Sequence, residues 1–191
     1  MQKVSKKHLI KIPKDVYLIY TNERKFIIFI NHNNKKSLLL NVQIFINKSK
    51  NFLKISRFSF INLPRNKQKQ KQNYQNQTVA LIKQYFIEIS VVLYKKLQFI
   101  GISYRLFNVN GFKNKLLLFK LGYSHFLYFK VLKMLEVCNF KMTRLFIFGN
   151  HYQKISQSAF KIRLCKKPEP YKGKGITYVT EKILLKKNKK V

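Results

Sequence analysis

The chain has 191 residues, with 40 Lys or Arg against 6 Asp or Glu, and its formal net charge is +34. Repulsion on that scale opposes a compact state, so we expect an abundant polyanion as its partner. The hydrophobic fraction of 46% and the aromatic fraction of 15% are typical of a chain that builds a core, and they exclude a purely disordered basic tail.

The composition and the first residues bear on the compartment of the protein. Lys, Asn, Ile, Phe and Tyr are abundant while Ala, Gly and Trp are scarce, as A+T-rich genomes encode. Met1 to Lys11 is basic and free of acids like a transit peptide, but it is short and leads directly into the strand-like Ile10 to Pro13. We therefore expect a mitochondrial protein encoded in the organelle, with a plastid or an A+T-rich bacterium as the alternatives.

Short apolar alternations fill the first half, and their period of two residues predicts strands of an antiparallel sheet. They are Asp15 to Tyr20, Arg24 to Asn31, Leu38 to Asn47 and Asn51 to Asn62. The Lys/Gln/Asn-rich residues 63–77 have little to bury, which predicts an exposed loop insertion. Thr78 is then the predicted N-cap of a helix that closes a first domain over residues 1–94. The apolar face of this helix consists of Ile82, Tyr85, Phe86, Ile89 and Leu93.

The second half repeats the order of strands followed by a helix. Its predicted strands are Lys96 to Phe107, Lys115 to Leu121, Phe126 to Val131 and Arg144 to Phe148. Asn150 is the predicted cap of a helix that ends at Cys165, with Ile155, Ala159 and Ile162 facing the sheet. We therefore predict an α+β fold of two similar domains, each a small antiparallel β-sheet packed on one helix. The second domain covers residues 95–178, and a basic C-terminal tail covers residues 179–191.

Residues that carry catalysis or bind metals are few and scattered. Cys138 and Cys165 form no CxxC pair, and the histidines lack the spacing of a metal site. The acids stand singly at Asp15, Glu23, Glu88, Glu136, Glu169 and Glu181. A metal-dependent nuclease needs clustered carboxylates, so we expect no enzyme and no cofactor. We also expect no membrane span, because the longest apolar run, Tyr85 to Tyr94, contains Glu88 and is shorter than the ~18 residues of a membrane helix.

The stretch from Leu164 to Tyr178 concentrates cations, prolines and glycines. Pro168 and Pro170 fix their own φ angles, so the chain leaves the preceding helix as a stiff segment. Beyond them, the Lys172-Gly-Lys-Gly175 run places charge beside backbone that can approach a partner closely. This combination predicts a loop that grips phosphate groups. An ordinary Pro/Gly turn with solvated lysines is the alternative.

Four stretches, taken in order, carry a resemblance to a known family. They are Lys7 to Val16, Tyr94 to Arg105, Leu121 to His125 and, most specific of all, Cys165-Lys-Lys-Pro-Glu-Pro-Tyr-Lys-Gly-Lys-Gly-Ile176. Together they resemble the landmarks of the large ribosomal subunit protein six family, bacterial type. The correspondence spans nearly the whole chain.

The resemblance implies a structural constituent of the large ribosomal subunit that binds ribosomal RNA mainly through its second half, near the sarcin-ricin loop and the translation factor-binding region. Its implied partners are this RNA and neighbouring large-subunit proteins, with translation factors nearby. The positions that match the family's RNA-facing motif are Lys166, Lys167, Tyr171, Lys172, Gly173, Lys174 and Gly175, with Ser124 and His125 as weaker candidates. On the predicted helix, Lys161 and Arg163 lie away from the apolar side and complete the predicted rRNA-binding set.

The chain also departs from the family pattern. Thr177 stands where Arg is common, Phe126 stands where Pro often follows the His, and the first half has lost most of the family's glycines. The loss of the glycines argues against RNA contacts in the first half. The insertion over residues 63–77 has no counterpart in the family pattern.

The expected mechanism is charge neutralisation and positioning. Lysines release counterions from phosphates, and the N–H groups of the glycines donate to phosphate oxygens. Tyr171 either stacks on an unpaired base or packs against Pro170. The tail from Lys182 to Lys190 either orders on RNA or forms a solvated helix end. A polybasic peripheral membrane protein and a non-ribosomal RNA-binding protein are the alternative explanations of the charge.

Overall fold

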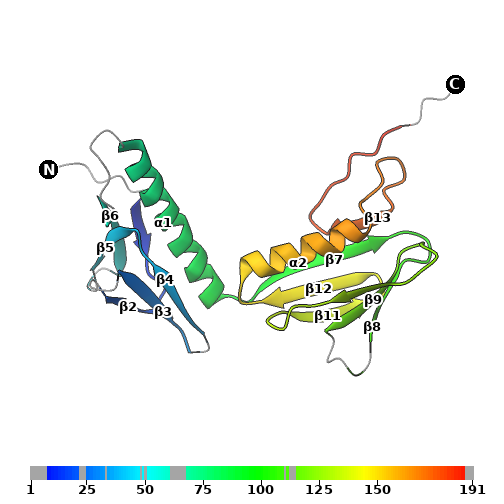
Figure 1. Cartoon of the computed structure of the whole chain (residues 1–191), viewed down its shortest axis with the longest axis horizontal. Helices are drawn as coiled ribbons and strands as arrows, with labels where there is room; N and C mark the ends of the chain where they lie inside the picture. The colour runs from blue at the N-terminus through cyan, green and yellow to red at the C-terminus, as the bar shows by residue number, and fades with distance from the viewer. Residues whose placement is uncertain are drawn as a thin grey trace. The chain divides into compact units, whose positions relative to one another are not determined.

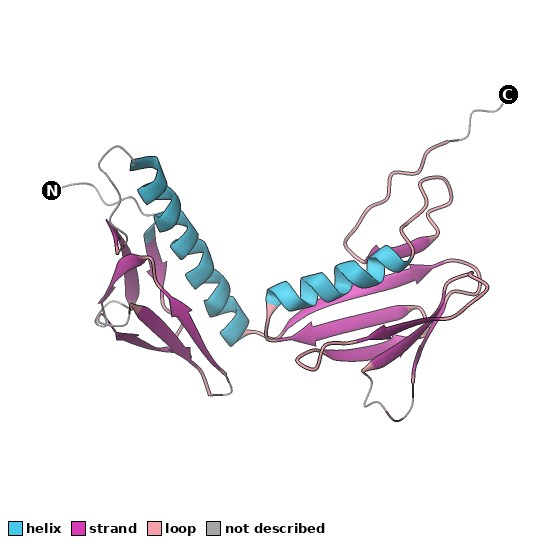
Figure 2. Ribbon diagram, viewed as in Figure 1, coloured by secondary structure: helices cyan, strands magenta, loops and turns pink. Residues whose placement is uncertain are grey.

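The computed structural model describes residues 8–21, 25–32, 34–47, 49, 51–60, 68–109, 111 and 115–187. The chain divides into two compact units, Met1–Val91 and Val92–Val191, which we call unit 1 and unit 2. Each unit combines small antiparallel sheets with one helix (Figures 1 and 2). The structure therefore confirms the predicted α+β class with two similar sheet-and-helix units.

Unit 1 holds two three-stranded antiparallel sheets within its described residues. One sheet has the order β1 (Leu9–Lys11), β6 (Phe52–Ser59) and β5 (Val42–Asn47), and the other has the order β2 (Tyr17–Thr21), β3 (Phe26–Ile30) and β4 (Lys35–Leu39). Successive side chains of a strand point to opposite faces, which is why Ile27 and Phe29 of β3 are fully buried. The predicted single strand over residues 38–47 is wrong, because the chain turns at Leu40 and Asn41 and forms β4 and β5 instead.

The helix of unit 1, α1 (Gln68–Ser90), begins ten residues before the predicted cap at Thr78. Gln and Lys are good helix formers, and the polar side chains of this stretch find partners in the protein. The Gln75 amide donates to the Ile55 carbonyl of β6 at 3.0 Å, and the Thr78 hydroxyl donates to the Gln75 carbonyl at 2.8 Å. The predicted loop insertion over residues 63–77 is therefore wrong from Gln68 onward, and residues 63–67 lie outside the described part.

The acid that interrupts the longest apolar run has a structural role. Glu88 of α1 is buried and forms an ion pair with Lys36 of β4, and the Gln84 amide donates to its other carboxylate oxygen at 2.8 Å. A buried carboxylate needs such partners to offset its desolvation. The pair therefore joins α1 to the second sheet of unit 1.

Unit 2 contains a four-stranded sheet, a three-stranded sheet and α2 (Tyr152–Cys165) in its described residues. The four-stranded sheet has the order β11 (Glu136–Lys141), β12 (Arg144–Gly149), β7 (Leu93–Ile100) and β13 (Gly175–Tyr178), and the three-stranded sheet has the order β10 (Leu127–Lys130), β9 (Leu116–Lys120) and β8 (Arg105–Asn108). All of these pairs are antiparallel. Figure 1 shows α2 lying across β7 and β12.

Two details of the predicted second half are wrong. The expected strand over residues 96–107 is interrupted at Gly101 to Tyr104, because Ser103 has a φ of 64° and the chain turns there. The N-cap of α2 is His151 rather than Asn150, and it makes no side-chain capping hydrogen bond. The strands β11 and β13 were not predicted.

The predicted core face of α2 is confirmed. Ile155, Ala159 and Ile162 are at most 1% exposed and belong to one core with Leu97 and Leu145 of the sheet. A helix places residues three and four apart on one side, so this spacing is enough to define the buried stripe.

Replacing Ile155 by Asp should unfold unit 2, because the carboxylate would be buried without a partner, and we expect a loss of more than about 3 kcal/mol in the free energy of unfolding. Gln157→Asp is the matched control, since Gln157 is exposed on the same helix. Denaturant unfolding followed by circular dichroism measures both. An Ile155→Asp protein as stable as the control would show that this face is not buried.

Candidate RNA interface

The cationic loop is a closed structure held by its own backbone. It covers residues 166–175, from the end of α2 to the first residue of β13, and we call it the arm. The Glu169 N–H donates to the Lys174 carbonyl and the Gly173 N–H donates to the Glu169 carbonyl, both at 2.9 Å. The Ile176 N–H donates to the Lys166 carbonyl at 2.9 Å and closes the base. The arm therefore has a defined shape without any bound partner.

The two glycines of the arm serve this packing. Gly175 has a φ of +150°, and a Cβ there would lie 2.6 Å from the Pro168 Cα. Gly173 has a φ of +68°, and its Cβ would lie 3.3 Å from a methyl group of Leu185. Both glycines are buried, and the Gly173 N–H already donates within the arm. This N–H is therefore already used within the arm, and contact between Gly173 and phosphate stays a prediction; the two glycines allow the close approach of the chain.

The turn over residues 121–125 meets the base of the arm. The Tyr123 hydroxyl donates to the Cys165 carbonyl at 3.1 Å, and the Lys166 ammonium lies 4.1 Å from the centre of the Tyr123 ring. The rings of Tyr123 and His125 stack with their centres 5.7 Å apart. The turn over residues 121–125 and the segment that begins at Cys165 are distant in sequence. They thus adjoin each other in the folded unit.

The predicted RNA-facing residues differ in exposure. Lys161, Lys167 and Lys172 are exposed, as are Ser124 and His125 of the turn. Lys166 and Lys174 are half-buried. Tyr171 is 51% exposed and is therefore accessible to a partner. The arm and the turn therefore present several ammonium groups and three accessible aromatic side chains, Tyr171, Tyr123 and His125, to solvent.

Arg163 differs from the other predicted cations, because its guanidinium already has a carboxylate partner. It donates to both oxygens of Glu181, with 3.2 Å from Nε to Oε2. These hydrogen bonds lower the pKa of Glu181. The guanidinium also lies 5.7 Å from the centre of the Tyr178 ring, and burial raises the pKa of that phenol. Arg163 thus fixes the chain after β13 against α2.

The first residues of the basic tail lie against the arm. The Lys186 N–H donates to the Pro170 carbonyl at 2.9 Å, and the Glu181 N–H donates to the Tyr178 carbonyl at 3.0 Å. Protein contacts therefore place the tail as far as Lys186, and residues 188–191 lie outside the described part.

Sequence reasoning missed Tyr123 and Lys95 as members of this region. Tyr123 lies within the Leu121 to His125 stretch, but only the structure shows that its hydroxyl bonds to the end of α2 and that its ring lies against Lys166. Lys95 of β7 lies between two rings, 5.6 Å from the centre of Tyr152 and 5.5 Å from that of Tyr178. The alternation along β7 could have predicted the position of Lys95, because it places Lys95 on the same side as Leu97, which faces α2.

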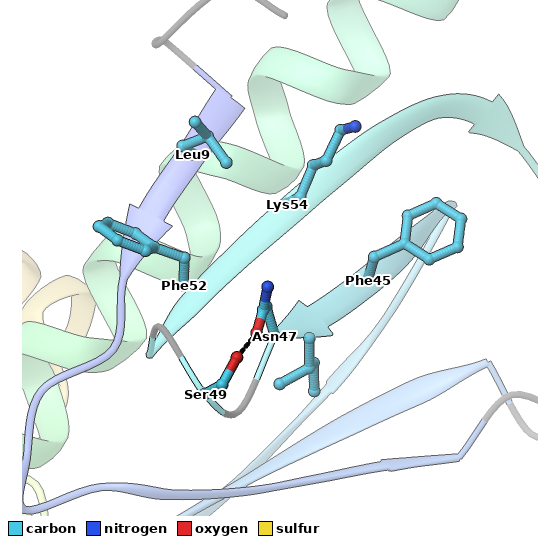
Figure 3. A pocket seen from close by; sticks show the side chains of 7 residues that line it. Leu9, Phe45, Asn47, Ser49, Phe52 and Lys54 are labelled. Atoms are coloured by element: carbon cyan, nitrogen blue, oxygen red, sulfur yellow. Dashed lines mark hydrogen bonds between the residues drawn. The ribbon is translucent and has the colours of Figure 1, made fainter.

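Unit 1 has a groove of about 850 Å³ on the outer face of its first sheet (Figure 3). Leu9 and Phe45 flank Lys54 in the strand register, and the Ser49 hydroxyl donates to the Asn47 amide oxygen at 2.7 Å. The lining residues are Leu9, Phe45, Ile46, Asn47, Ser49, Phe52 and Lys54. They include no carboxylate, so the groove offers no acid and base pair for catalysis.

Within the described residues, no three side chains of His, Cys, Asp or Glu come together as a metal site. Cys138 and Cys165 are free thiols, and burial raises the pKa of Cys165. Neither described helix is long and apolar enough to cross a bilayer.

Comparison with known proteins relates the chain to ribosomal proteins. The family model for ribosomal protein L6 matches residues 106–179, which include the turn, α2 and the arm. A Bartonella bacilliformis protein called large ribosomal subunit protein uL6 is 30% identical over 154 residues, which cover 81% of each chain. Proteins of the same name from Mycoplasmoides gallisepticum and Nitrobacter winogradskyi are 37% and 41% identical, over 58% and 50% of this chain. These two alignments span 58% and 52% of the relatives' own lengths.

Replacing Gly175 by Ala should break the closed base of the arm. We expect a loss of about 2–4 kcal/mol in the stability of unit 2, because a Cβ would meet the backbone at Pro168 in a conformation that only glycine readily adopts. Gly111→Ala is the matched control: its φ is +87°, but a Cβ there would have no described heavy atom within 4 Å, so it should lose only about 1–2 kcal/mol. Equal losses in denaturant unfolding would contradict the packing role of Gly175.

Proposed function

Because this chain belongs to the ribosomal protein L6 family, we propose that it is a structural constituent of the large ribosomal subunit and binds ribosomal RNA through the arm and the turn over residues 121–125. The family consists of structural ribosomal proteins rather than enzymes, in agreement with the scattered acids of the sequence. The proposed partners are large-subunit ribosomal RNA and neighbouring ribosomal proteins.

One observation carries the proposal. The turn over residues 121–125 and the base of the arm meet at Tyr123. Its hydroxyl donates a hydrogen bond to the Cys165 carbonyl, and the Lys166 ammonium lies over its ring. This contact brings the base of the arm, with Lys166, beside the turn that carries the exposed Ser124 and His125. The lysines need a counter-charge, and folded RNA supplies phosphates at high density.

The mechanism is positioning by charge. Each lysine that meets a phosphate releases condensed counterions, which favours binding without reading the sequence. The closed backbone of the arm lowers the entropy lost on binding, since the loop is already shaped. Tyr171 can stack on an unpaired base. Folded RNA is thereby recognised through its shape and its phosphate positions.

The resemblance and the family support a more specific location within the subunit. We place the arm near the sarcin-ricin loop, with the translation factor-binding region and translation factors nearby. Footprinting of ribosomal RNA in subunits with and without this protein tests the location. Protection confined to other regions of the RNA would contradict it.

The compartment is a further part of the proposal. The A+T-type composition supports a mitochondrial ribosome, whereas the relatives named above are bacterial, which is consistent with the bacterial alternative. Fractionation of the source cells tests this part, and recovery of the protein with ribosomes outside mitochondria would contradict it.

Replacing Lys172 by Ala, or Lys174 by Ala, should weaken binding to ribosomal RNA, because each change removes one phosphate contact. The slope of log K against log salt concentration should flatten by about 0.7–0.9 for each variant. Lys83→Ala removes the same charge from the exposed side of α1 in unit 1 and should leave the slope unchanged. Equal slopes for all three variants and the parent protein would exclude phosphate contact at the arm.

Cosedimentation tests the function as a whole. The endogenous protein should travel with large ribosomal subunits and leave them only in high salt. Binding to anionic liposomes as tight as binding to ribosomal RNA would instead favour a peripheral membrane protein.

A further inference from the structure

The four-stranded sheet of unit 2 has a second face, opposite α2. Alternation along β7 sends Leu97 into the core and Lys95 toward α2, so Tyr94 and Lys96 lie on the other side. On β12, Leu145 and Ile147 are buried, and the residues between and beyond them belong to this second face. We call it the aromatic face. Its members include Tyr94, Lys96, Gln98, Glu136, Cys138, Phe140, Arg144, Phe146 and Phe148.

Aromatic rings adjoin one another across three strands of this face. The strand register places Phe148 opposite Tyr94, and Cys138 and Lys96 on either side of Phe146. The rings of Phe140 and Phe146 meet edge to face with their centres 4.8 Å apart. Phe140 is 72% exposed and Tyr94 is 60% exposed. Such exposure of large rings on a sheet indicates a surface that meets a partner.

Cations lie among these rings. The Lys96 ammonium lies 4.9 Å from the centre of the Phe146 ring and 5.4 Å from that of Tyr94. Arg144 is exposed on β12, two residues from Phe146 and opposite Gln98 of β7. Lys141 is exposed at the end of β11. The one carboxylate on these strands, Glu136, lies on this face opposite Phe148, at the far end of β11 from Phe140 and Lys141. A purely apolar partner would leave Lys96 desolvated without a counter-charge, which is unfavourable.

We propose that the aromatic face binds single-stranded RNA, with unpaired bases stacked on Phe140, Phe146 and Tyr94 and phosphates bound by Lys96 and Arg144. Every base has a π-face, so such a surface accepts many sequences. Exposed aromatic residues on a four-stranded sheet are a known platform for stacking bases. The arm binds mainly through its lysines, with Tyr171 as its candidate for stacking, whereas this face offers several rings together, so substitutions in the two places separate the two sites.

The test uses the full chain and a pyrimidine oligoribonucleotide of about eight nucleotides, a length within the range that one stacking module covers. An abasic oligomer of the same length keeps the phosphates and loses the bases. We expect the oligomer with bases to bind about fivefold more tightly or better. Equal affinity for the two oligomers would overturn the proposal, and the rings would then belong to another class of partner.

Substitutions locate the effect. Phe140→Ala and Phe146→Ala should each weaken binding of the oligomer with bases by about fivefold or more and leave binding of the abasic oligomer unchanged. Phe58→Ala in unit 1 is the matched control, because Phe58 is 74% exposed, and it should change neither affinity. Phe140 is exposed enough that its loss spares the fold, so unchanged binding by Phe140→Ala and Phe146→Ala alike would overturn the proposal.

Cys138 supplies an independent readout. It is exposed on the aromatic face, whereas Cys165 is half-buried at the base of the arm. The oligomer with bases should slow alkylation of Cys138 by iodoacetamide, and the abasic oligomer should not. An unchanged alkylation rate of Cys138 at saturating oligomer would contradict the proposal. Lys172→Ala should weaken binding of both oligomers by the same factor. A variant of the aromatic face should weaken binding only of the oligomer with bases, so the two sites are tested separately.

Discussion

The backbone hydrogen bonds that return the chain from α2 to the edge of β7 hold the functional half of the molecule together. They close the arm between Glu169, Gly173 and Lys174 and pair β13 with β7 from Gly175 to Tyr178. The close approach at Gly175 and the Arg163 pair with Glu181 depend on this return. With the arm closed, its lysines project from a fixed frame rather than from a flexible tail.

In unit 2 the residues that stabilise the fold and the residues that carry the binding charge lie on different surfaces. The core stripe of α2 and the inner side of the sheet supply stability through buried apolar area. The arm supplies ammonium groups, and the aromatic face supplies rings with Lys96 among them. A chain of net charge +34 gains stability when phosphates neutralise this surplus. Folding and RNA binding are therefore coupled through electrostatics, although the shape of the arm is set by the protein.

Periodicity and motif predicted the class of fold, the buried stripe around Ile155 and the segment that forms the arm. They failed at the start of α1, because polar residues such as Gln75 are held there by hydrogen bonds to the sheet rather than by apolar burial. β13 was missed because its pairing with β7 is long-range. In the candidate site, the motif predicts that the Gly173 N–H donates to phosphate, whereas in the structure this N–H donates to the Glu169 carbonyl. Side-chain partners of this kind leave no local pattern in a sequence.

Hydrogen exchange of the arm amides in the RNA-free protein tests the account most directly. We predict that the N–H groups of Glu169, Gly173 and Ile176 are already protected from exchange without RNA, because each donates to a backbone carbonyl. Added RNA should then change their exchange little. Exchange at the rate of an unfolded chain, slowed only when RNA is present, would show that RNA and not the protein shapes the arm.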